Sequence, residues 1–234
     1  MEVNHRFKGF PWYKYLDSLY PRQTVTVAGL GGVGSWLTLF LSRIGNIGLR
    51  LYDFDKVEQH NIGCQFLAND SLYMYKTTAM VNVISKFSNS LNLNYSTYTE
   101  KVTEYSILSP ISFCCFDNLE SRNVMVDNWY NSYKDDPKAI FIDGRLEGEL
   151  FIIYCVRPNE DSYNKYKETL DKESLVDTVG ACTTEQSTHM GAAIASMMTI
   201  LFTNHLSNLQ SGTEVREVPF KTDMLCPLLD LNFE

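Results

Sequence analysis

Two features of this sequence have the residue types and spacing needed to bind a nucleotide. The first is the segment GLGGVG at residues 29–34, which contributes Gly29, Gly31, Gly32 and Gly34. The second is Asp53, which lies 19 residues after the last of these glycines. Glycines let the backbone turn tightly and approach a phosphate, and a carboxylate at that distance can accept hydrogen bonds from ribose hydroxyls. The two features together predict a site for an adenine nucleotide.

The hydrophobic pattern around the glycines predicts the elements that must position them. Residues 23–28 are predicted to form a buried strand and residues 35–44 an apolar helix, so the glycines form a strand-to-helix turn. The start of such a helix offers free N–H groups and a positive dipole end to an anion. A second strand is predicted at residues 49–54, and Asp53 lies at its end. This order of elements is typical of dinucleotide-binding folds.

Strands and helices alternate along the rest of the sequence. Helices are predicted at residues 75–91, 119–133 and 191–205, and strands at residues 94–100, 111–116, 139–142 and 150–156. The polar residues 157–180 have no clear periodicity and are predicted to form an irregular excursion, followed later by a tail over residues 212–234. We expect a single α/β domain over residues 1–234, in which residues 1–22 form an N-terminal arm.

Composition and charge bear on the class of protein. The chain has 234 residues, of which 44% are hydrophobic, as in an ordinary globular protein. Its net charge of −8 argues against a nucleic-acid partner, because phosphate binding needs an excess of lysine and arginine. No stretch approaches the roughly 18 to 20 apolar residues that span a bilayer, and residues 1–11 lack the apolar core of a signal peptide. We therefore expect a cytoplasmic protein without a membrane partner.

The six cysteines do not form a recognisable metal site. None of them belongs to a Cys-x-x-Cys pair, so no zinc is expected, and their irregular spacing does not suggest a disulfide framework. Cys114, Cys115 and Cys155 fall inside predicted strands and are predicted to lie in the core.

The residues after Asp53 extend the nucleotide-binding pattern. Residues 53–65 read DFDKVEQHNIGCQ, Lys76 opens a predicted helix, and Asp117-Asn118 follow a predicted strand. Together with the glycines, this pattern resembles the ThiF/MoeB/HesA family of ubiquitin-activating-enzyme-like adenylyltransferases over residues 23–205. The resemblance implies a Rossmann-like ThiF-type α/β fold, with a mainly parallel central sheet flanked by helices and antiparallel strands near the C-terminal side. It also implies that ATP and Mg²⁺ are used to adenylate a carboxylate.

The resemblance implies a role for each matching residue. It places Asp53 on the ribose, Asn61 and Lys76 on the phosphates, and Asp117 on magnesium. These residue types suit the chemistry, because lysine can neutralise phosphate oxygens and Mg²⁺ prefers one or two carboxylates plus phosphates. The pattern adds three more polar residues to the nucleotide site: Asp55, Gln65 and Asn118.

Two of these assignments have simpler alternatives. Lys76 could instead be a solvated lysine at the start of a helix. Asp117-Asn118 could instead be the N-cap of the helix that follows, although Asp117 could serve in both roles.

The sequence departs from the family at one position. Members of the family commonly carry arginine before the glutamine of the 53–65 segment, but this chain has Cys64 there. A thiol cannot replace a guanidinium that clamps phosphate. The resemblance implies that an N-terminal arginine reaches the nucleotide of the neighbouring subunit in a homodimer, which makes Arg6 a candidate substitute, although Arg6 could also simply be solvated. Arg122 is a second candidate.

The resemblance also implies a loop over the tail of the partner and a thiol beside it. Residues 157–180 correspond to the crossover loop of related enzymes, and Cys182 lies between that loop and the predicted helix 191–205. A thiol at the start of a helix can be made nucleophilic by the dipole, but Cys182 could equally be a small packing residue. His189 is expected to have a structural rather than a catalytic role.

The leading interpretation is a homodimeric adenylyltransferase. Its partner would be a ubiquitin-like protein, or another small carrier protein or peptide, with a flexible C-terminus, and the activated carboxylate could then pass to a thiol. An NAD-dependent oxidoreductase would account for the glycines and Asp53, but not jointly for Asp55, Asn61, Lys76 and Asp117. A catalytically inactive nucleotide-binding scaffold is the third possibility, and Cys64 is the residue that favours it.

Overall fold

A computed structural model describes residues 7–19, 23–45, 47–88, 94–173, 187–225 and 230–233. The strands are β1 (Thr24–Ala28), β2 (Gly48–Tyr52), β3 (Tyr95–Tyr98), β4 (Ile111–Cys114), β5 (Ile140–Glu147), β6 (Leu150–Val156), β7 (Lys221–Leu225) and β8 (Asp230–Phe233). The helices are α1 (Pro11–Leu19), α2 (Gly34–Ile44), α3 (Lys76–Phe87), α4 (Leu119–Tyr133), α5 (Glu160–Glu173) and α6 (Thr188–Ser211). None of the helices in these residues is both long and apolar enough to cross a membrane.

The strands form one sheet in the order β3-β2-β1-β4-β5-β6-β7-β8. Neighbouring strands from β3 to β5 are parallel, whereas β5 to β8 pair in antiparallel fashion. This arrangement confirms the predicted α/β class, with a mainly parallel sheet and antiparallel strands toward the C-terminus. The chain moves outward from β1 to β3 and then returns to β4, so the order reverses between β1 and β4. In open α/β sheets, ligands bind at the carboxyl ends of the strands beside such a reversal.

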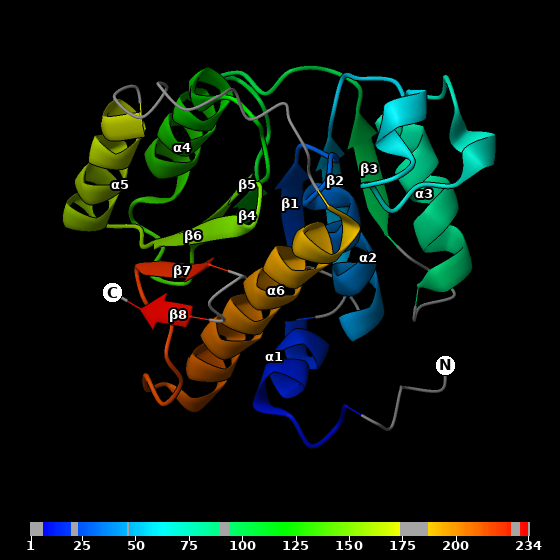
Figure 1. The fold of residues 1–234 in the computed structure, drawn as a ribbon. Helices are drawn as coiled ribbons and strands as arrows, with labels where there is room; N and C mark the ends of the chain where they lie inside the picture. The colour runs from blue at the N-terminus through cyan, green and yellow to red at the C-terminus, as the bar shows by residue number, and fades with distance from the viewer. Residues whose placement is uncertain are drawn as a thin grey trace.

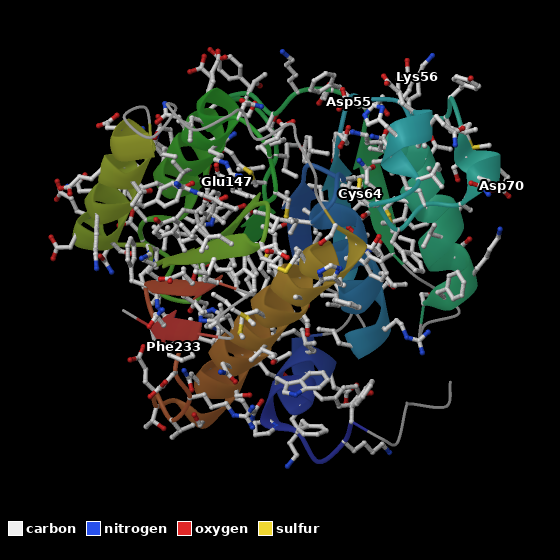
Figure 2. All side chains as sticks on the ribbon, viewed as in Figure 1. Asp55, Lys56, Cys64, Asp70, Glu147 and Phe233 are labelled. Atoms are coloured by element: carbon white, nitrogen blue, oxygen red, sulfur yellow. The ribbon has the colours of Figure 1, made fainter. Side chains whose placement is uncertain are left out.

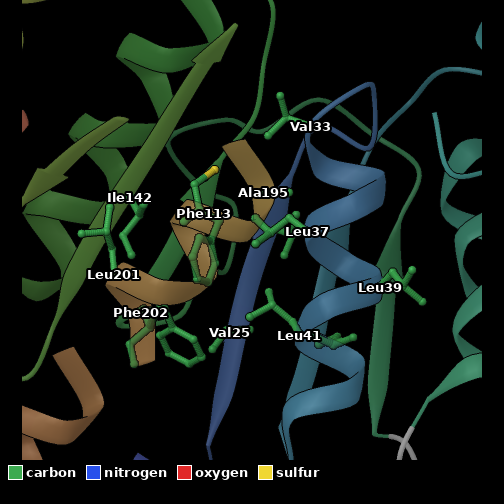
Figure 3. Packing of buried hydrophobic residues seen from close by; sticks show 14 of the residues in the cluster. Val25, Val33, Leu37, Leu39, Leu41, Phe113, Ile142, Ala195, Leu201 and Phe202 are labelled. Carbon is green, nitrogen blue, oxygen red and sulfur yellow. The ribbon is translucent and has the colours of Figure 1, made fainter. Parts of the chain in front are cut away.

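Helices cover both faces of the sheet (Figure 1). On one face, α1, α2, α3 and α6 pack on a cluster that includes Val25, Leu49 and Phe113. Figure 3 shows part of this cluster, in which side chains of α2 and α6 meet across β1 and β4. On the other face, α4 and α5 pack on a second cluster around Trp129 and Phe141. Successive side chains along a strand point alternately into the two clusters, as expected of a sheet that is buried on both sides.

Two segments differ from the predictions. Residues 160–173 form helix α5 instead of an irregular loop, and it buries Tyr166 and Leu170 against the second cluster. The helical period was faint because most of its other residues are polar. Residues 174–180 of the expected crossover loop lie outside the described residues. In the N-terminal arm, residues 11–19 form α1, which packs along α6.

Helix α6 carries a buried histidine whose hydrogen bonds define its protonation state. His205 is 1% exposed. Arg157 Nη1 donates to His205 Nδ1 over 3.1 Å, and His205 Nε2 donates to the Lys138 carbonyl over 2.9 Å. Because a guanidinium can only donate, Nδ1 must accept and the imidazole must be neutral. Burial is the main cause that lowers the pKa of His205 to about 4, and Arg157 adds to this effect.

We expect acid to destabilise the fold through His205. Its ordinary pKa is 6.5, so between pH 6.5 and 4 the unfolded chain binds a proton that the folded chain does not. The contribution to stability is complete above pH 6.5 and is lost toward pH 4, by about 3 kcal/mol in total. We therefore expect the free energy of unfolding, measured in urea, to fall less between pH 7.5 and pH 4.5 in His205→Gln than in the unsubstituted protein. His60, whose side chain is 75% exposed, provides the control, and His60→Gln should leave the loss unchanged.

Candidate functional site

The glycine-rich turn lies between β1 and α2, and at Gly29 and Gly34 its main chain comes too close to neighbouring backbone for a side chain. Gly29 has φ +86°, and a Cβ added to it would lie 2.6 Å from the Cys115 carbonyl oxygen after β4. A Cβ added to Gly34 would lie 1.8 Å from the Gly29 carbonyl oxygen. Because helix α2 begins at Gly34, its first N–H groups lie at this turn. The backbone contacts fix the shape of the turn, and the free N–H groups at its end can receive an anion.

Asp53 fastens the turn to the end of β2. Its Oδ2 accepts the Leu30 N–H over 2.7 Å and its Oδ1 accepts the Asp55 N–H over 2.8 Å. Burial raises the pKa of Asp53 above its ordinary value, while Lys76 and these two N–H groups oppose the rise. Each carboxylate oxygen has a second lone pair, so Asp53 can still accept from a ribose hydroxyl.

Lys76 begins α3 and is held beside Asp55. The Lys76 ammonium lies 2.9 Å from Asp55 Oδ2, and the Lys76 N–H donates to the Asp55 carbonyl over 2.9 Å. The Lys76 side chain is 10% exposed, whereas that of Asp55 is 49% exposed. The alternative of a solvated lysine is therefore wrong. A largely desolvated ammonium with one half-exposed partner is well suited to receive a further anion. Figure 2 shows Asp55 at the end of the sheet toward which β1 and β2 run.

The segment between β2 and α3 places polar groups against the turn. Asn61 is buried, and its Oδ1 accepts the Glu58 N–H over 2.9 Å in a short helical turn. The Asn61 carbonyl in turn accepts the N–H groups of Cys64 and Gln65. Gln65 Oε1 is buried without a hydrogen-bond partner, and its Nε2 lies 4.0 Å from where a Cβ on Gly31 would be. The Gln65 amide thus faces the glycines with unused hydrogen-bonding capacity.

Cys64 stands where members of the family commonly carry arginine, and it belongs to the same segment before α3 (Figure 2). Its carbonyl accepts the indole N–H of Trp36 over 3.3 Å, and its Sγ lies 3.6 Å from the Asn61 carbonyl oxygen. Burial raises the pKa of the Cys64 thiol, although Lys76 acts in the opposite direction. The thiol is therefore uncharged at neutral pH and does not replace a guanidinium.

Asp117 and Asn118 follow β4 at the same edge of the sheet. Asn118 Oδ1 accepts the Ser121 N–H over 2.8 Å, so Asn118 is the N-cap of α4, and its Nδ2 donates to Asp117 Oδ1 over 3.1 Å. The Cys115 N–H donates to the Ala28 carbonyl over 2.8 Å, which ties this segment to the end of β1. Asp117 itself is exposed. The N-cap belongs to Asn118, so the Asp117 carboxylate remains available to a metal ion.

The other candidate residues divide into three groups. Arg122 is buried and donates to the carboxylate of Asp143, so the prediction that it could replace the missing arginine is wrong. His189 is exposed at the start of α6, where its Nε2 lies 3.3 Å from the Ser187 hydroxyl. Arg6 and Cys182 lie outside the described residues.

A buried cluster that the sequence interpretation missed lies behind Asp117. Asp143 of β5 is fully buried and accepts from Arg122, from Arg145 Nε over 2.6 Å and from the Tyr166 hydroxyl over 3.0 Å. Burial alone would raise the pKa of Asp143, but the two guanidiniums and these hydrogen bonds hold it below its ordinary value. The signal in the sequence was an Asp-Gly-Arg interruption of an apolar strand, since buried charges are paired.

Helix α6 begins directly against the glycine-rich turn. A Cβ added to Gly191 would lie 2.4 Å from the Gly32 carbonyl oxygen, and the Thr188 hydroxyl donates to the Gly63 carbonyl. The first turn of α6 therefore supports both the turn before α2 and the segment that carries Asn61 and Gln65.

Replacing Gly191 by alanine should separate α6 from the turn. Alanine favours a helix over glycine by about 1 kcal/mol, but contact with a backbone carbonyl at this distance forces a shift that costs about 1–3 kcal/mol. We expect a net loss of stability in urea unfolding. Gly63→Ala is the control, because a Cβ there meets no atom within 4 Å. If Gly191→Ala proves as stable as Gly63→Ala, or more stable, then α6 does not make this close contact with the Gly32 carbonyl.

Residues 20–224 match the ThiF family. This chain belongs to the ThiF family. Among curated relatives, the ubiquitin-like modifier-activating enzyme 5 of Arabidopsis thaliana is 28% identical over 82% of this chain and 48% of its own length. The same-named enzyme of Culex quinquefasciatus is 27% identical over 76% of this chain and 49% of its own length. The ThiF-family chain thus spans about half the length of the curated relatives it matches.

Solved structures share the fold of this ThiF-family chain. MccB of E. coli with ATP superposes with a TM-score of 0.68 at 14% identity, over 94% of this chain and 66% of its own. PaaA superposes with a TM-score of 0.67 at 17% identity, over 94% of this chain and 65% of its own. At these identities the likeness shows the ThiF-type fold, as predicted.

Proposed function

We propose that this ThiF-family chain uses ATP to adenylate the C-terminal carboxylate of a ubiquitin-like protein or another small protein or peptide. One observation carries the proposal. The desolvated Lys76 ammonium, the glycine-rich turn and the exposed Asp117 carboxylate all lie where the parallel strands β2, β1 and β4 end. These groups suit a triphosphate and a metal ion, and the rest of the fold does not need Asp117.

The names of similar proteins support this substrate class. The curated relatives are named as enzymes that activate ubiquitin-like modifiers. The structures of E. coli MccB include complexes with ATP and with MccA. We extend these properties to this chain as part of the proposal.

The proposed reaction exchanges one phosphoryl bond for another. A carboxylate oxygen of the partner attacks the α-phosphorus of ATP, the new O–P bond forms, and the bond between the α-phosphorus and the bridging oxygen breaks. The bridging oxygen leaves with its electron pair as part of pyrophosphate. Negative charge gathers on the phosphates during this step, so a positioned cation lowers the barrier. Lys76 would supply that cation, while Asn61, Gln65 and the amides of the turn hold the phosphates.

The residues present also fit the nucleotide and Mg²⁺. Gln65 has a buried amide oxygen without a partner, which can accept from a ligand hydroxyl or amino group, and its amide nitrogen lies beside Gly31 of the turn. Within the described part of the chain, no three His, Cys, Asp or Glu side chains form a metal cluster. Mg²⁺ usually needs only one or two carboxylates when phosphates supply the other ligands. Asp117 would hold the ion, and the ion would neutralise charge on the phosphates.

Several finer points belong to the proposal. Arg6 of a second copy would supply the missing guanidinium in a homodimer, and Cys182 would receive the acyl group as a thioester. A cytoplasmic location is proposed with them.

ATP–pyrophosphate exchange tests the function. The protein is incubated with ATP, Mg²⁺, labelled pyrophosphate and candidate partners that differ in the C-terminal tail, and label should enter ATP only with an accepted carboxylate. Nucleotide binding without exchange for any partner would favour the inactive scaffold. Binding of NADH in place of ATP, measured by calorimetry, would favour the oxidoreductase instead.

A further inference from the structure

The backbone that leads into Asp117 is held by a side chain from the following helix. Arg122 of α4 donates through Nη2 to the carbonyl of Phe116, the residue immediately before Asp117. Its Nη1 donates to Asp143 Oδ1 and lies 3.4 Å from the Gly144 carbonyl oxygen. One guanidinium therefore joins the end of β4 to the middle of β5. Asp117 is exposed, but the peptide group that carries it is fixed from the interior.

The far side of this connection is rigid. Asp143 is 0% exposed, and it also accepts from Arg145 and from Tyr166 of α5. The Arg145 guanidinium lies 4.5 Å from the centre of the Tyr154 ring. A carboxylate that is bonded on both oxygens cannot rotate freely, so Arg122 in turn has one orientation.

We propose that Arg122 is a positioning residue that aims the Asp117 carboxylate at the metal ion by holding the Phe116 carbonyl. This inference rests on the proposed function, since it takes Asp117 as the metal ligand. Metal ligands depend on the groups that orient them, and loss of an orienting group typically lowers metal affinity about 10- to 100-fold.

The chemistry of arginine explains why this position needs a guanidinium. Its planar fork presents donors in two directions, so one side chain can hold a carboxylate and a carbonyl together. A lysine ammonium is a compact point charge and does not hold both acceptors in one plane. Arg145 provides the matched comparison, because it bonds the same carboxylate but donates on its other side to Thr169.

The charge balance gives variants that should fold. Two guanidiniums surround one carboxylate, so Arg122→Met leaves a neutral Asp143–Arg145 pair, and Arg145→Met leaves a neutral Asp143–Arg122 pair. A methionine of similar length fills most of the volume. Arg122→Lys is a third variant that keeps the charge but removes the fork.

The test measures Mn²⁺ binding to the protein–ATP complex by electron paramagnetic resonance, and ATP binding with EDTA by calorimetry. We expect Arg122→Met and Arg122→Lys to weaken Mn²⁺ binding about tenfold and to leave metal-free ATP binding unchanged. Arg145→Met should leave both unchanged. Equal weakening by Arg122→Met and Arg145→Met would overturn the proposal, as would an unfolded circular dichroism spectrum for both Arg122 variants. If Asp117→Asn binds Mn²⁺ as the unsubstituted protein does, the metal assignment fails, and the proposed function with it.

Discussion

Replacing Lys76 by methionine is expected to lower ATP–pyrophosphate exchange about 100- to 1000-fold without unfolding the chain. The ammonium pairs with Asp55 and acts on the pKa of Asp53 and of Cys64, and its side chain is 10% exposed. A desolvated charge acts strongly on phosphate, because little water screens it. Methionine keeps the apolar stem, and the Asp55 carboxylate left behind is half exposed and can be solvated.

The neighbouring lysine is the control for this prediction. Lys56 lies in the same segment, is exposed, and stacks 5.1 Å over the Tyr75 ring. Lys56→Met removes the same charge from the same region, so it should retain exchange within a few-fold. Both variants are compared at saturating ATP and partner, with unfolding in urea as the check on integrity. Equal rates for the two variants would show that Lys76 does not contact the reacting phosphates.

The second large effect is expected at Asp143, where asparagine should destabilise the fold by about 3–5 kcal/mol. The carboxylate is fully buried between Arg122 and Arg145, and asparagine leaves two guanidiniums in the interior without an anion. Asparagine has nearly the same shape, so the loss reports the charge and not a cavity. The effect is a large part of the stability of a domain of this size.

Asp127 offers the comparison for Asp143. It pairs with Lys167 over 2.7 Å, but the two side chains are 38% and 29% exposed. Exposed ion pairs of this kind contribute about 0.2–1 kcal/mol. Urea unfolding at pH 7.5 should therefore separate Asp143→Asn clearly from Asp127→Asn. A similar loss in the two variants would mean that water reaches the Asp143 cluster.

The parts of the fold that followed from the sequence are those with a strong period or a backbone requirement. The glycine-rich turn, β1, β2 and the small-residue helix α6 follow from apolar runs and from glycines that no other residue can replace. Helix α5 could not be recognised in this way, because over residues 160–171, where its side chains are described, it buries only Tyr166 and Leu170. Its place in the fold depends on the tertiary contacts of those two side chains.

Some residues of the candidate site could likewise be predicted from the sequence, and others depend on tertiary contacts. The places of Asp53 beside the turn and of Lys76 beside Asp55 could be predicted from their spacing and from the resemblance, since both stand at fixed distances from recognisable elements. The role of Arg122 could not, because its spacing after Asp117 suits a ligand contact as well as it suits a bond to the Phe116 carbonyl. Asp143 decides between these two contacts, because it binds Arg122 and turns it inward. Asp143 is 21 residues further along the chain and reaches Arg122 only through the pairing of β4 with β5.

The tight contacts of the glycines separate what the fold requires from what the chemistry requires. Gly29, Gly34 and Gly191 each face a main-chain oxygen at a distance that excludes a side chain, whether or not a nucleotide is present. A descendant of this chain that lost the proposed activity would still lose stability if it replaced any of the three. Lys76 and Asp117 are under no comparable constraint, so substitutions at these two positions would be the first sign in related chains that the proposed catalysis had been lost.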